Sequence, residues 1–414
     1  MINVVLFSSD YLPKIGGVAT HVHELARALT VAGQQVCVVA PRDSSWRQPA
    51  TWLSRHGVTN GIKTVQPSLA SLPRGWGQHW RVCRYVKRLL RTLSRHCASI
   101  VLHCHDYEAY GHYVAQHCPQ TVRIFTNHTS TFLQDFDNPA THAQLRRNLD
   151  LYDWIITPSQ ELADRTAALG YPADRITFIP NGVDTERFRP EPSLRDAIRC
   201  ELGIPPNHTV LLCARRVVPK NGVIDFAHSL RFLAQYVTQT TVLFAGNQYS
   251  FDSYERETMA AAKHSPLGPS VRFLGSVPNA EIHRLYTVAD IAILPSLKEA
   301  TSLSGLEAMA SGVALVATRV GGLHHLVDHE IDGLLVEPGD PRDLARAITQ
   351  LIANPNLVAE FGRRARQKVC QHFSWTHIAA RTAGVYQQAA PIASLRRAKT
   401  PPPSHTSSPI GARA

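Results

Sequence analysis

The 414-residue sequence has no hydrophobic run long enough to span a bilayer and no CxxC pair among its eight cysteines. The first absence argues against an integral membrane protein, and the second argues against a zinc ribbon or a disulfide framework. Scattered cysteines of this kind are typical of thiols in a reducing compartment. A strand-like pattern, not a signal peptide, starts at Ile2, so we expect a cytoplasmic protein.

Two phosphate-binding signatures are also missing. The sequence contains neither the GxGxxG fingerprint of dinucleotide-binding folds nor the GxxxxGK[ST] string of P-loop proteins. A nicotinamide-dependent oxidoreductase and a P-loop phosphotransferase are therefore disfavoured.

Acidic residues are few relative to basic ones, 32 against 43, and the formal net charge of +11 indicates an anionic partner. Zinc-finger spacing, aromatic RNA-binding signatures and basic heptads are absent, so we do not expect a nucleic acid. The phosphates of a nucleotide sugar and anionic lipid head groups both fit this charge.

One stretch, residues 74–95, contains no acidic residue. Its apolar residues follow helical spacing and basic residues fill the other positions, a pattern typical of helices that lie on anionic membranes. Two interpretations remain open. Residues 81–95 contact the inner face of a membrane peripherally, or the stretch is an outer helix of a domain with a solvated charged face.

Short apolar runs alternate with helical patterns in both halves of the chain, which predicts an α/β fold. Strands at residues 2–8 and 35–40, with a helix over 21–32 between them, form a βαβ opening. A second strand series starts at residues 210–214, after a linker-like composition near 185–200. We therefore expect two doubly wound parallel-sheet domains.

Residues 295–322 carry the densest set of candidate binding residues. They indicate the end of a strand, a loop, a helix capped by Thr301 or Ser302, and a second strand. Glu299 lies in the loop and Glu307 about one turn into the helix. A helix N-terminus at the carboxyl end of a strand suits a phosphate and two carboxylates suit hydroxyls, which together indicate a sugar nucleotide. The alternative is an incidental pair, because acidic residues favour helix starts.

The first half contributes a glycine pair and two histidines at strand ends. Gly16 and Gly17 follow the first strand, where bare backbone N–H groups can approach a phosphate; a plain tight turn is the alternative. His105 and His128 follow later strands, at the edge where open α/β sheets bind ligands. Neither histidine belongs to a close metal-ligand spacing, so we expect no metal.

Five segments, taken in order, resemble the retaining glycosyltransferases of the GT-B fold, specifically the group-4 family with its "glycosyl transferases group 1" domain. The resemblance extends from residue 2 to about residue 390. The segments are PKIGGVATHVHELARAL, PNGVDTERFRP, ARRVVPKNG, FLGSVPNAEIHRLYTVADIAILPS and EATSLSGLEAMASGVALVATRVGG.

This resemblance implies two Rossmann-like domains that face each other across a cleft. The acceptor domain would span residues 1–188 and the nucleotide-sugar domain residues 189–371. A final helix, residues 372–388, would pack back on the first domain. We expect the Pro-, Ser- and Arg-rich tail, residues 390–414, to be disordered.

The resemblance also implies roles for residues of the second domain. Glu299 and Glu307 match an E-x7-E motif, in which the first glutamate contacts the hydroxyls of the donor sugar and the second contacts the nucleotide ribose. The backbone N–H groups of Thr301, Ser302 and Leu303 would hold the distal phosphate.

A basic pair after the first strand of the second domain would stabilise the leaving diphosphate. The family form is an arginine, four residues and then Lys-Gly, whereas this chain reads RRVVPKNG. Alignment favours Arg216 with Lys220, and Arg215 remains a candidate. Asn221 stands where lysine is common.

Three further positions match the family. His128 corresponds to the histidine near the anomeric centre, Gly17 to the loop glycine close to the diphosphate, and Val277 lies where main-chain groups hold the base. The implied catalytic residues are Glu299, His128, Lys220 and Arg216.

We therefore expect a retaining glycosyltransferase that moves a sugar from a UDP- or GDP-sugar to a lipid, glycan or small-molecule acceptor without a metal or cofactor. The helix N-terminus and the basic pair would stabilise the negative charge on the leaving phosphate in place of a metal. The alternative is a noncatalytic sugar-nucleotide-binding or scaffold protein on the same fold.

Overall fold

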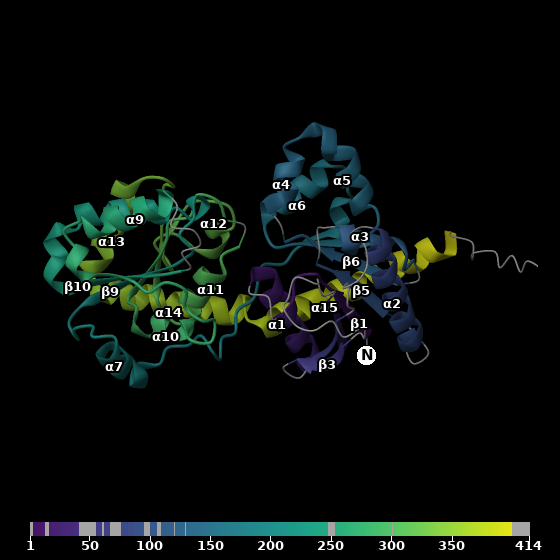
Figure 1. Cartoon of the computed structure of the whole chain (residues 1–414), viewed down its shortest axis with the longest axis horizontal. Coiled ribbons are helices and arrows are strands. Elements are labelled where there is room, and N and C mark those ends of the chain that lie inside the picture. Colours follow the sequence, from purple (N-terminus) through teal and green to yellow (C-terminus); the bar gives the residue numbers. More distant parts are fainter. Residues whose placement is uncertain are drawn as a thin grey trace, which may run out of the picture.

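Parallel strands form the centre of each half of the chain (Figure 1). The structure is a computed structural model, and it describes residues 3–12, 16–40, 55–59, 62–66, 76–94, 100–105, 109–119, 121–128, 130–246, 253–299 and 301–399.

Eight strands form the first sheet, in the order β3-β4-β2-β1-β5-β6-β7-β8. Neighbouring strands are parallel except for β3 and β4, an antiparallel hairpin at the edge. The order reverses direction at β1 and β5, the switch point where such sheets bind ligands. The strands are β1 (Asn3–Phe7), β2 (Gln35–Val39), β3 (Arg55–Thr59), β4 (Ile62–Gln66), β5 (Ile100–Cys104), β6 (Val122–Thr126), β7 (Trp154–Thr157) and β8 (Ile176–Phe178).

Helices cover both faces of this sheet, because side chains alternate along each strand. Val4 and Leu6 of β1 pack on the face covered by α1 and α15, whereas Val5 and Phe7 pack on the opposite face. The helices are α1 (Gly17–Val31), α2 (Trp76–Ser94), α3 (Ala109–Gln116), α4 (Ser130–Phe136), α5 (His142–Leu149), α6 (Gln160–Ala168) and α15 (Trp375–Lys399).

The apolar side of α2 is used inside the first domain. Val82, Val86 and Leu90 are buried in the same cluster as residues of β1 and β5, while Arg84 and Arg88 are exposed. This arrangement matches the outer-helix interpretation of residues 74–95. In the part of the chain that the structure describes, none of the helices has the length and apolar character needed to cross a bilayer.

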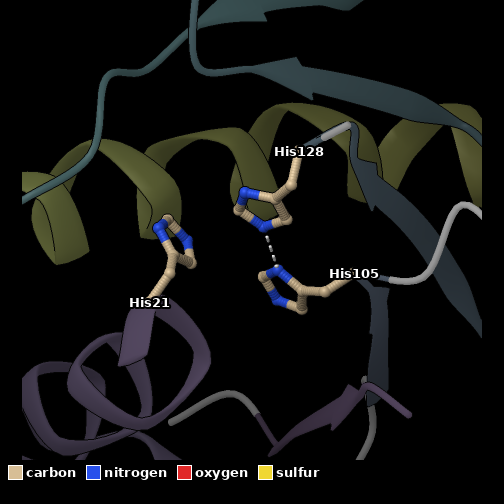
Figure 2. A group of neighbouring side chains, drawn as sticks. All are labelled: His21, His105 and His128. Carbon is tan, nitrogen blue, oxygen red and sulfur yellow. Dashed lines mark hydrogen bonds between the residues drawn. The ribbon is translucent and has the colours of Figure 1, made fainter. Parts of the chain in front are cut away.

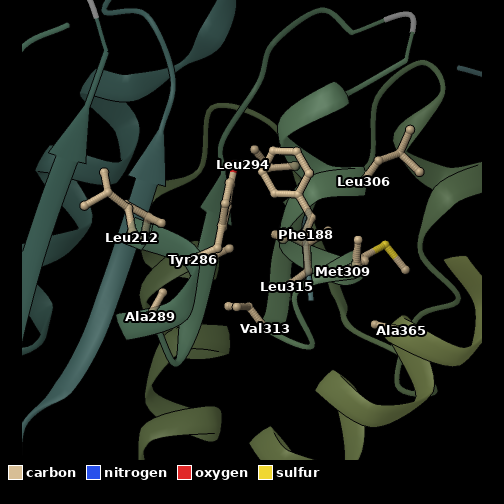
Figure 3. Close-up of a cluster of buried hydrophobic side chains, with 14 of the residues drawn as sticks. Phe188, Leu212, Tyr286, Ala289, Leu294, Leu306, Met309, Val313, Leu315 and Ala365 are labelled. Atoms are coloured by element: carbon tan, nitrogen blue, oxygen red, sulfur yellow. The ribbon is translucent and has the colours of Figure 1, made fainter. Parts of the chain in front are cut away.

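Six parallel strands form the second sheet, in the order β11-β10-β9-β12-β13-β14. The strands are β9 (Thr209–Ala214), β10 (Thr240–Ala245), β11 (Val271–Phe273), β12 (Ile291–Leu294), β13 (Ala314–Thr318) and β14 (Leu334–Val336). The helices are α7 (Pro192–Glu201), α8 (Val223–Ser229), α9 (Ser253–Lys263), α10 (Ile282–Val288), α11 (Leu303–Ala310), α12 (Leu323–Leu326), α13 (Pro341–Ile352) and α14 (Pro355–His372). Figure 3 shows part of the core of this domain, where Leu212, Leu306 and Ala365 belong to one buried cluster that anchors α11.

The chain passes between the domains twice, and the two crossings are hydrogen-bonded to each other. The N–H of Val183 donates to the carbonyl of Phe373 at 2.9 Å. A Cβ at Gly182 would lie 2.6 Å from the ring of Trp375, so the close approach of the crossings requires glycine. From there α15 runs into the first domain and packs against α1 and β6 (Figure 1).

The predicted fold class, an α/β protein with two Rossmann-like parallel-sheet domains, is confirmed, with differences in single elements. The helix predicted from residue 21 starts at Gly17, and the β3–β4 hairpin was not predicted. The helix predicted to end at 388 runs to Lys399, because Ala389 and Ala393 are buried against the first domain. Residues 390–399 of the expected disordered tail are therefore helical, and residues 400–414 lie outside the described residues.

Candidate active site

Glu299 lies in the loop between β12 and α11, as the sequence indicates. Ser302 is the N-cap of α11, and its hydroxyl accepts a hydrogen bond from the N–H of Gly305 at 3.1 Å. Gly312, with a φ of 72°, follows the helix end in the left-handed region that glycine favours. The predicted cap and stop of this helix are confirmed, and the N-terminus of α11 opens at the carboxyl end of β12.

Arg215 is the centre of a polar group at the same edge of the second sheet. It follows β9, and its side chain and that of Glu299 are each 13% exposed and form an ion pair. Its guanidinium donates to Asn221 Oδ1 at 2.9 Å, Ser296 Oγ at 3.0 Å, Ser304 Oγ at 3.2 Å and a carboxylate oxygen of Glu299. We call these five residues the arginine cluster.

The other two basic residues of this loop are exposed, unlike Arg215. Arg216 and Lys220 are exposed, so the structure brings Arg215, and not Arg216, into contact with Glu299. The carbonyl of Lys220 accepts the N–H of Leu297 at 2.9 Å, which joins the basic loop to the loop that carries Glu299.

Glu307 lies in α11 beside the core of the second domain. The hydroxyl of Tyr286 lies 3.3 Å from its Oε2 and 3.1 Å from the carbonyl of Ser304. Loss of solvation raises the pKa of Glu307 to about 7, and the hydrogen bond from Tyr286 lowers it in part.

Residues of the two domains meet beside α11. Gly17 begins α1, and a Cβ there would lie 3.8 Å from Leu303 Cδ1, so the N-termini of α1 and α11 face each other. The hydroxyl of Thr301 donates to the carbonyl of Pro158 in the first domain. Val277 lies farther along the second domain, in the segment after β11, where it packs partly buried on the core.

Three histidines lie together in the first domain, and we call them the histidine triad (Figure 2). His105 follows β5, His128 follows β6, and their Nδ1 and Nε2 atoms are hydrogen-bonded at 2.9 Å. His21 comes from α1, with its ring centroid 4.4 Å from that of His128 and its Nδ1 2.8 Å from Asn181 Oδ1. Burial lowers the pKa of all three, that of His21 to about 4, so they are neutral at physiological pH.

His103 supports this triad from β5. Its Nδ1 is 2.8 Å from the hydroxyl of Tyr386 in α15, and its Nε2 is 2.6 Å from Thr126 Oγ1. Its ring lies against that of His105, with centroids 4.1 Å apart. The last helix of the chain therefore helps to fix the position of the strand-end histidines.

Sequence reasoning missed His21, Ser296 and Tyr286, and it favoured Arg216 over Arg215, whereas it is Arg215 that contacts Glu299. His21 follows the Gly16-Gly17 turn by one turn of helix, and no linear spacing connects it with His105 or His128. Most of the predicted residues form two groups, one around Arg215 and α11 and one around His128, and Val277 lies apart from both.

Two family models match the chain. The model "Glycosyltransferase Family 4" matches residues 15–187, and "Glycosyl transferases group 1" matches residues 195–368. The α-maltose-1-phosphate synthase of Mycolicibacterium smegmatis is 26% identical, over 93% of this chain and 99% of its own length. The D-inositol 3-phosphate glycosyltransferase 2 of Catenulispora acidiphila is 29% identical, over 90% of each chain.

Solved structures share the fold. Sucrose-phosphate synthase from Thermosynechococcus elongatus superposes with a TM-score of 0.72 at 22% identity, over 95% of this chain and 100% of its own. HepE from Anabaena, solved in complex with UDP-glucose, superposes with a TM-score of 0.69 at 21% identity, over 95% and 99%.

Proposed function

Because the chain belongs to the group 1 glycosyltransferases and is itself a glycosyltransferase of the GT-B fold, we propose that it moves a sugar from a UDP- or GDP-sugar to its acceptor with retention of anomeric configuration and without a metal ion. The observation that carries this proposal is the arginine cluster at the N-terminus of α11. HepE, which shares the fold, binds UDP-glucose and supports a nucleotide sugar as donor.

The sugar and phosphates of the donor would bind at α11. Glu299 accepts hydrogen bonds from sugar hydroxyls, and the N–H groups of Thr301, Ser302 and Leu303 bind the distal phosphate at the positive end of the helix. Ser302 already caps this terminus, which supports a preformed site.

Arg215, with Lys220, stabilises the charge that develops on the leaving diphosphate. We choose Arg215 over Arg216 because the guanidinium of Arg215 already lies beside Glu299 and Ser304, whereas Arg216 is exposed. Preorganised donors of this kind replace the charge stabilisation that a metal would otherwise supply.

The remaining residues orient the ends of the donor. Glu307 accepts hydrogen bonds from the ribose, main-chain groups around Val277 hold the base, and Gly17 lets the backbone of α1 approach the diphosphate. His128 faces the transferred sugar. The acceptor attacks from the side of the leaving phosphate, which takes the acceptor's proton, so the bond to the diphosphate is replaced by a bond on the same face of the sugar.

The acceptor is a lipid, a glycan or a small molecule, and the charge of the chain favours an anionic one. Two of the relatives are named for phosphorylated sugars or polyols. Since the apolar side of α2 is buried, contact of residues 81–95 with a membrane would be electrostatic, through side chains such as Arg84 and Arg88. Cosedimentation with anionic but not neutral vesicles, weakened by salt, is the expected result; equal binding to both would contradict it.

A screen of sugar nucleotides tests the proposal. One donor should raise the thermal midpoint of the protein and be turned over. Glu299→Gln should lower kcat by about 100-fold or more, because a charged acceptor and the partner of Arg215 are both lost. Glu337→Gln, an exposed carboxylate of the same domain, is the matched control and should leave the rate unchanged. Full transfer by Glu299→Gln would refute the site.

A further inference from the structure

Three imidazoles from distant parts of the chain meet at the carboxyl ends of β5 and β6, beside α1 (Figure 2). One ring nitrogen each of His21, His105 and His128 lies within 4.8 Å of one from each of the other two. We propose that this histidine triad is a binding site for Zn²⁺ or a similar transition-metal ion, distinct from the transfer reaction. The inference goes beyond the proposed function, which needs no metal.

The contact between His21 and Asn181 prepares His21 as a ligand. The Oδ1 of Asn181 accepts a hydrogen bond from Nδ1 of His21 at 2.8 Å, so the proton of this neutral ring lies on Nδ1. The lone pair of Nε2 is then available. Histidines that bind metals commonly donate their second N–H to an oxygen in this way, which fixes both the tautomer and the ring orientation.

His105 and His128 already hold two nitrogens at nearly the separation that an ion needs. Their bonded nitrogens are 2.9 Å apart, and two nitrogens of a tetrahedral zinc site with Zn–N bonds of about 2.1 Å lie about 3.4 Å apart. A small opening of this contact would admit the ion. One of the two bonded nitrogens carries the proton of this hydrogen bond. When the ion binds, that proton moves to the other nitrogen of the same ring, so binding releases no net proton.

The surroundings leave His105 available for this role. Its Nε2 is buried and has no hydrogen-bond partner in the described part of the chain, so the ring's one side-chain hydrogen bond there is the contact of Nδ1 with His128. The neighbouring His103 differs, because both of its nitrogens are engaged, by Tyr386 and Thr126. The ligand set is therefore a triad and does not include the fourth histidine.

The chemistry of the donors selects the class of ion. Three neutral imidazoles suit Zn²⁺, Co²⁺, Ni²⁺ or Cu²⁺, whereas Mg²⁺ and Ca²⁺ prefer oxygen ligands. Three protein ligands leave a fourth position for water.

The place of the histidine triad indicates how a bound ion would affect transfer, and this consequence rests on the proposed function. If His128 faces the transferred sugar, an ion held by His128 occupies part of the space beside the sugar. Zn²⁺ should then lower the transferase rate, and a chelator should restore it. This is the opposite of the behaviour of a metal cofactor.

The direct test is titration of the chelator-stripped full chain with Co²⁺, without any sugar nucleotide. We expect one equivalent to give the visible absorption bands of tetrahedral cobalt, and Zn²⁺ but not Mg²⁺ to displace it. His105→Asn and, separately, His21→Asn should weaken binding at least about tenfold, since each removes one of three ligands. Circular dichroism of each metal-free variant checks its fold, and either variant that folds decides the matter.

His324→Asn is the matched control. His324 and His325 are exposed and their rings lie 4.1 Å apart, so they form a surface pair suited to adventitious metal binding, and this variant should bind cobalt unchanged. The proposal is overturned by the absence of the bands, by undiminished binding in either triad variant that folds, or by loss of binding in His324→Asn. None of these measurements uses transfer, so they remain informative if the proposed function fails.

Discussion

Arg215 joins two loops of the candidate active site. Its guanidinium contacts Asn221 in the basic loop and Glu299 in the loop before α11. The amide of Asn221 in turn donates to the carbonyl of Arg216 at 2.8 Å and so fixes the basic loop around the guanidinium. Asn221 therefore both accepts a hydrogen bond from Arg215 and closes the basic loop around it.

Replacing the two arginines one at a time separates their roles. Arg215→Ala should lower kcat/KM for the donor by about 100- to 1,000-fold, because it removes a preorganised cation from the leaving group. Arg216→Ala is the matched control and should change it by less than about threefold, since an exposed charge contributes little. Steady-state kinetics measure kcat/KM for both variants, and their thermal midpoints check that both remain folded. A larger loss in the Arg216 variant would reverse the assignment.

Glu307 gives the site a pH dependence. Its pKa is about 7 in the folded protein against the usual 4.5, because solvation is lost beside Tyr286. As pH rises, the unfolded chain loses this proton first, so between about pH 4.5 and 7 the folded state holds more protons and its stability falls with rising pH. The ionised carboxylate, however, is the better acceptor for ribose hydroxyls.

Glu307→Gln should therefore act in opposite directions on stability and on binding. The thermal midpoint of Glu307→Gln minus that of the unsubstituted protein should increase as pH rises from about 5 to 8. The KM of the unsubstituted protein for its donor should fall as pH rises through about 7, and that of Glu307→Gln should be higher and nearly independent of pH. Parallel KM profiles for the two proteins would show that Glu307 does not contact the donor.

Single residues were predictable where a local pattern determines their position. Glu299, Ser302 and Glu307 follow from a strand, a cap and a helix that are contiguous in sequence. The sequence favoured Arg216, whereas Arg215 contacts Glu299. Adjacent residues after a strand point to different sides and both fit the family pattern, so the sequence does not determine which side chain enters the site. His21 could not be found, because only the tertiary fold brings it to His105 and His128.

At the scale of elements, the basic loop and the Glu299 loop are held together by their backbones. Gly222 has a φ of 60°, and a Cβ there would lie 1.8 Å from the carbonyl oxygen of Pro295. This close approach requires glycine, and it brings the loop after β9 against the loop after β12. The arginine cluster depends on that contact.

Gly222→Ala should therefore destabilise the second domain by at least about 3 kcal/mol, through backbone strain and overlap with Pro295. Gly203→Ala is the matched control, because Gly203 has the same φ of 60° but a Cβ there meets no atom within 4 Å among the described residues. It should cost only about 1–2 kcal/mol. Thermal midpoints of the two variants measure the difference, and equal shifts would show that the close approach is not required.

Elements were predicted well where apolar runs are buried on both faces. The central strands of both sheets belong to this class. The β3–β4 hairpin was missed, because the edge strand RHGVT is polar and has little of the alternation that marks a strand. The extension of α15 was missed, because composition alone suggested disorder, whereas burial of Ala389 and Ala393 against the first domain stabilises the helix.

At the scale of the whole molecule, each domain carries one of the two polar groups described above. The arginine cluster lies at the strand ends of the second domain and the histidine triad at those of the first. Gly17 beside Leu303 and Thr301 beside Pro158 join the domains between them. The chain crosses between the domains at Val183 and at Phe373, and these crossings are hydrogen-bonded to each other. Beyond them, α15 packs on the first domain.

The central claim is metal-independent retaining transfer at this interface, and proton NMR of the transfer product tests it most directly. The full chain is treated with EDTA, and the donor found by screening is supplied with an acceptor. We predict a product whose anomeric configuration equals that of the donor, formed at an undiminished rate. An inverted product, or transfer that returns only when a divalent ion is added, would contradict the account.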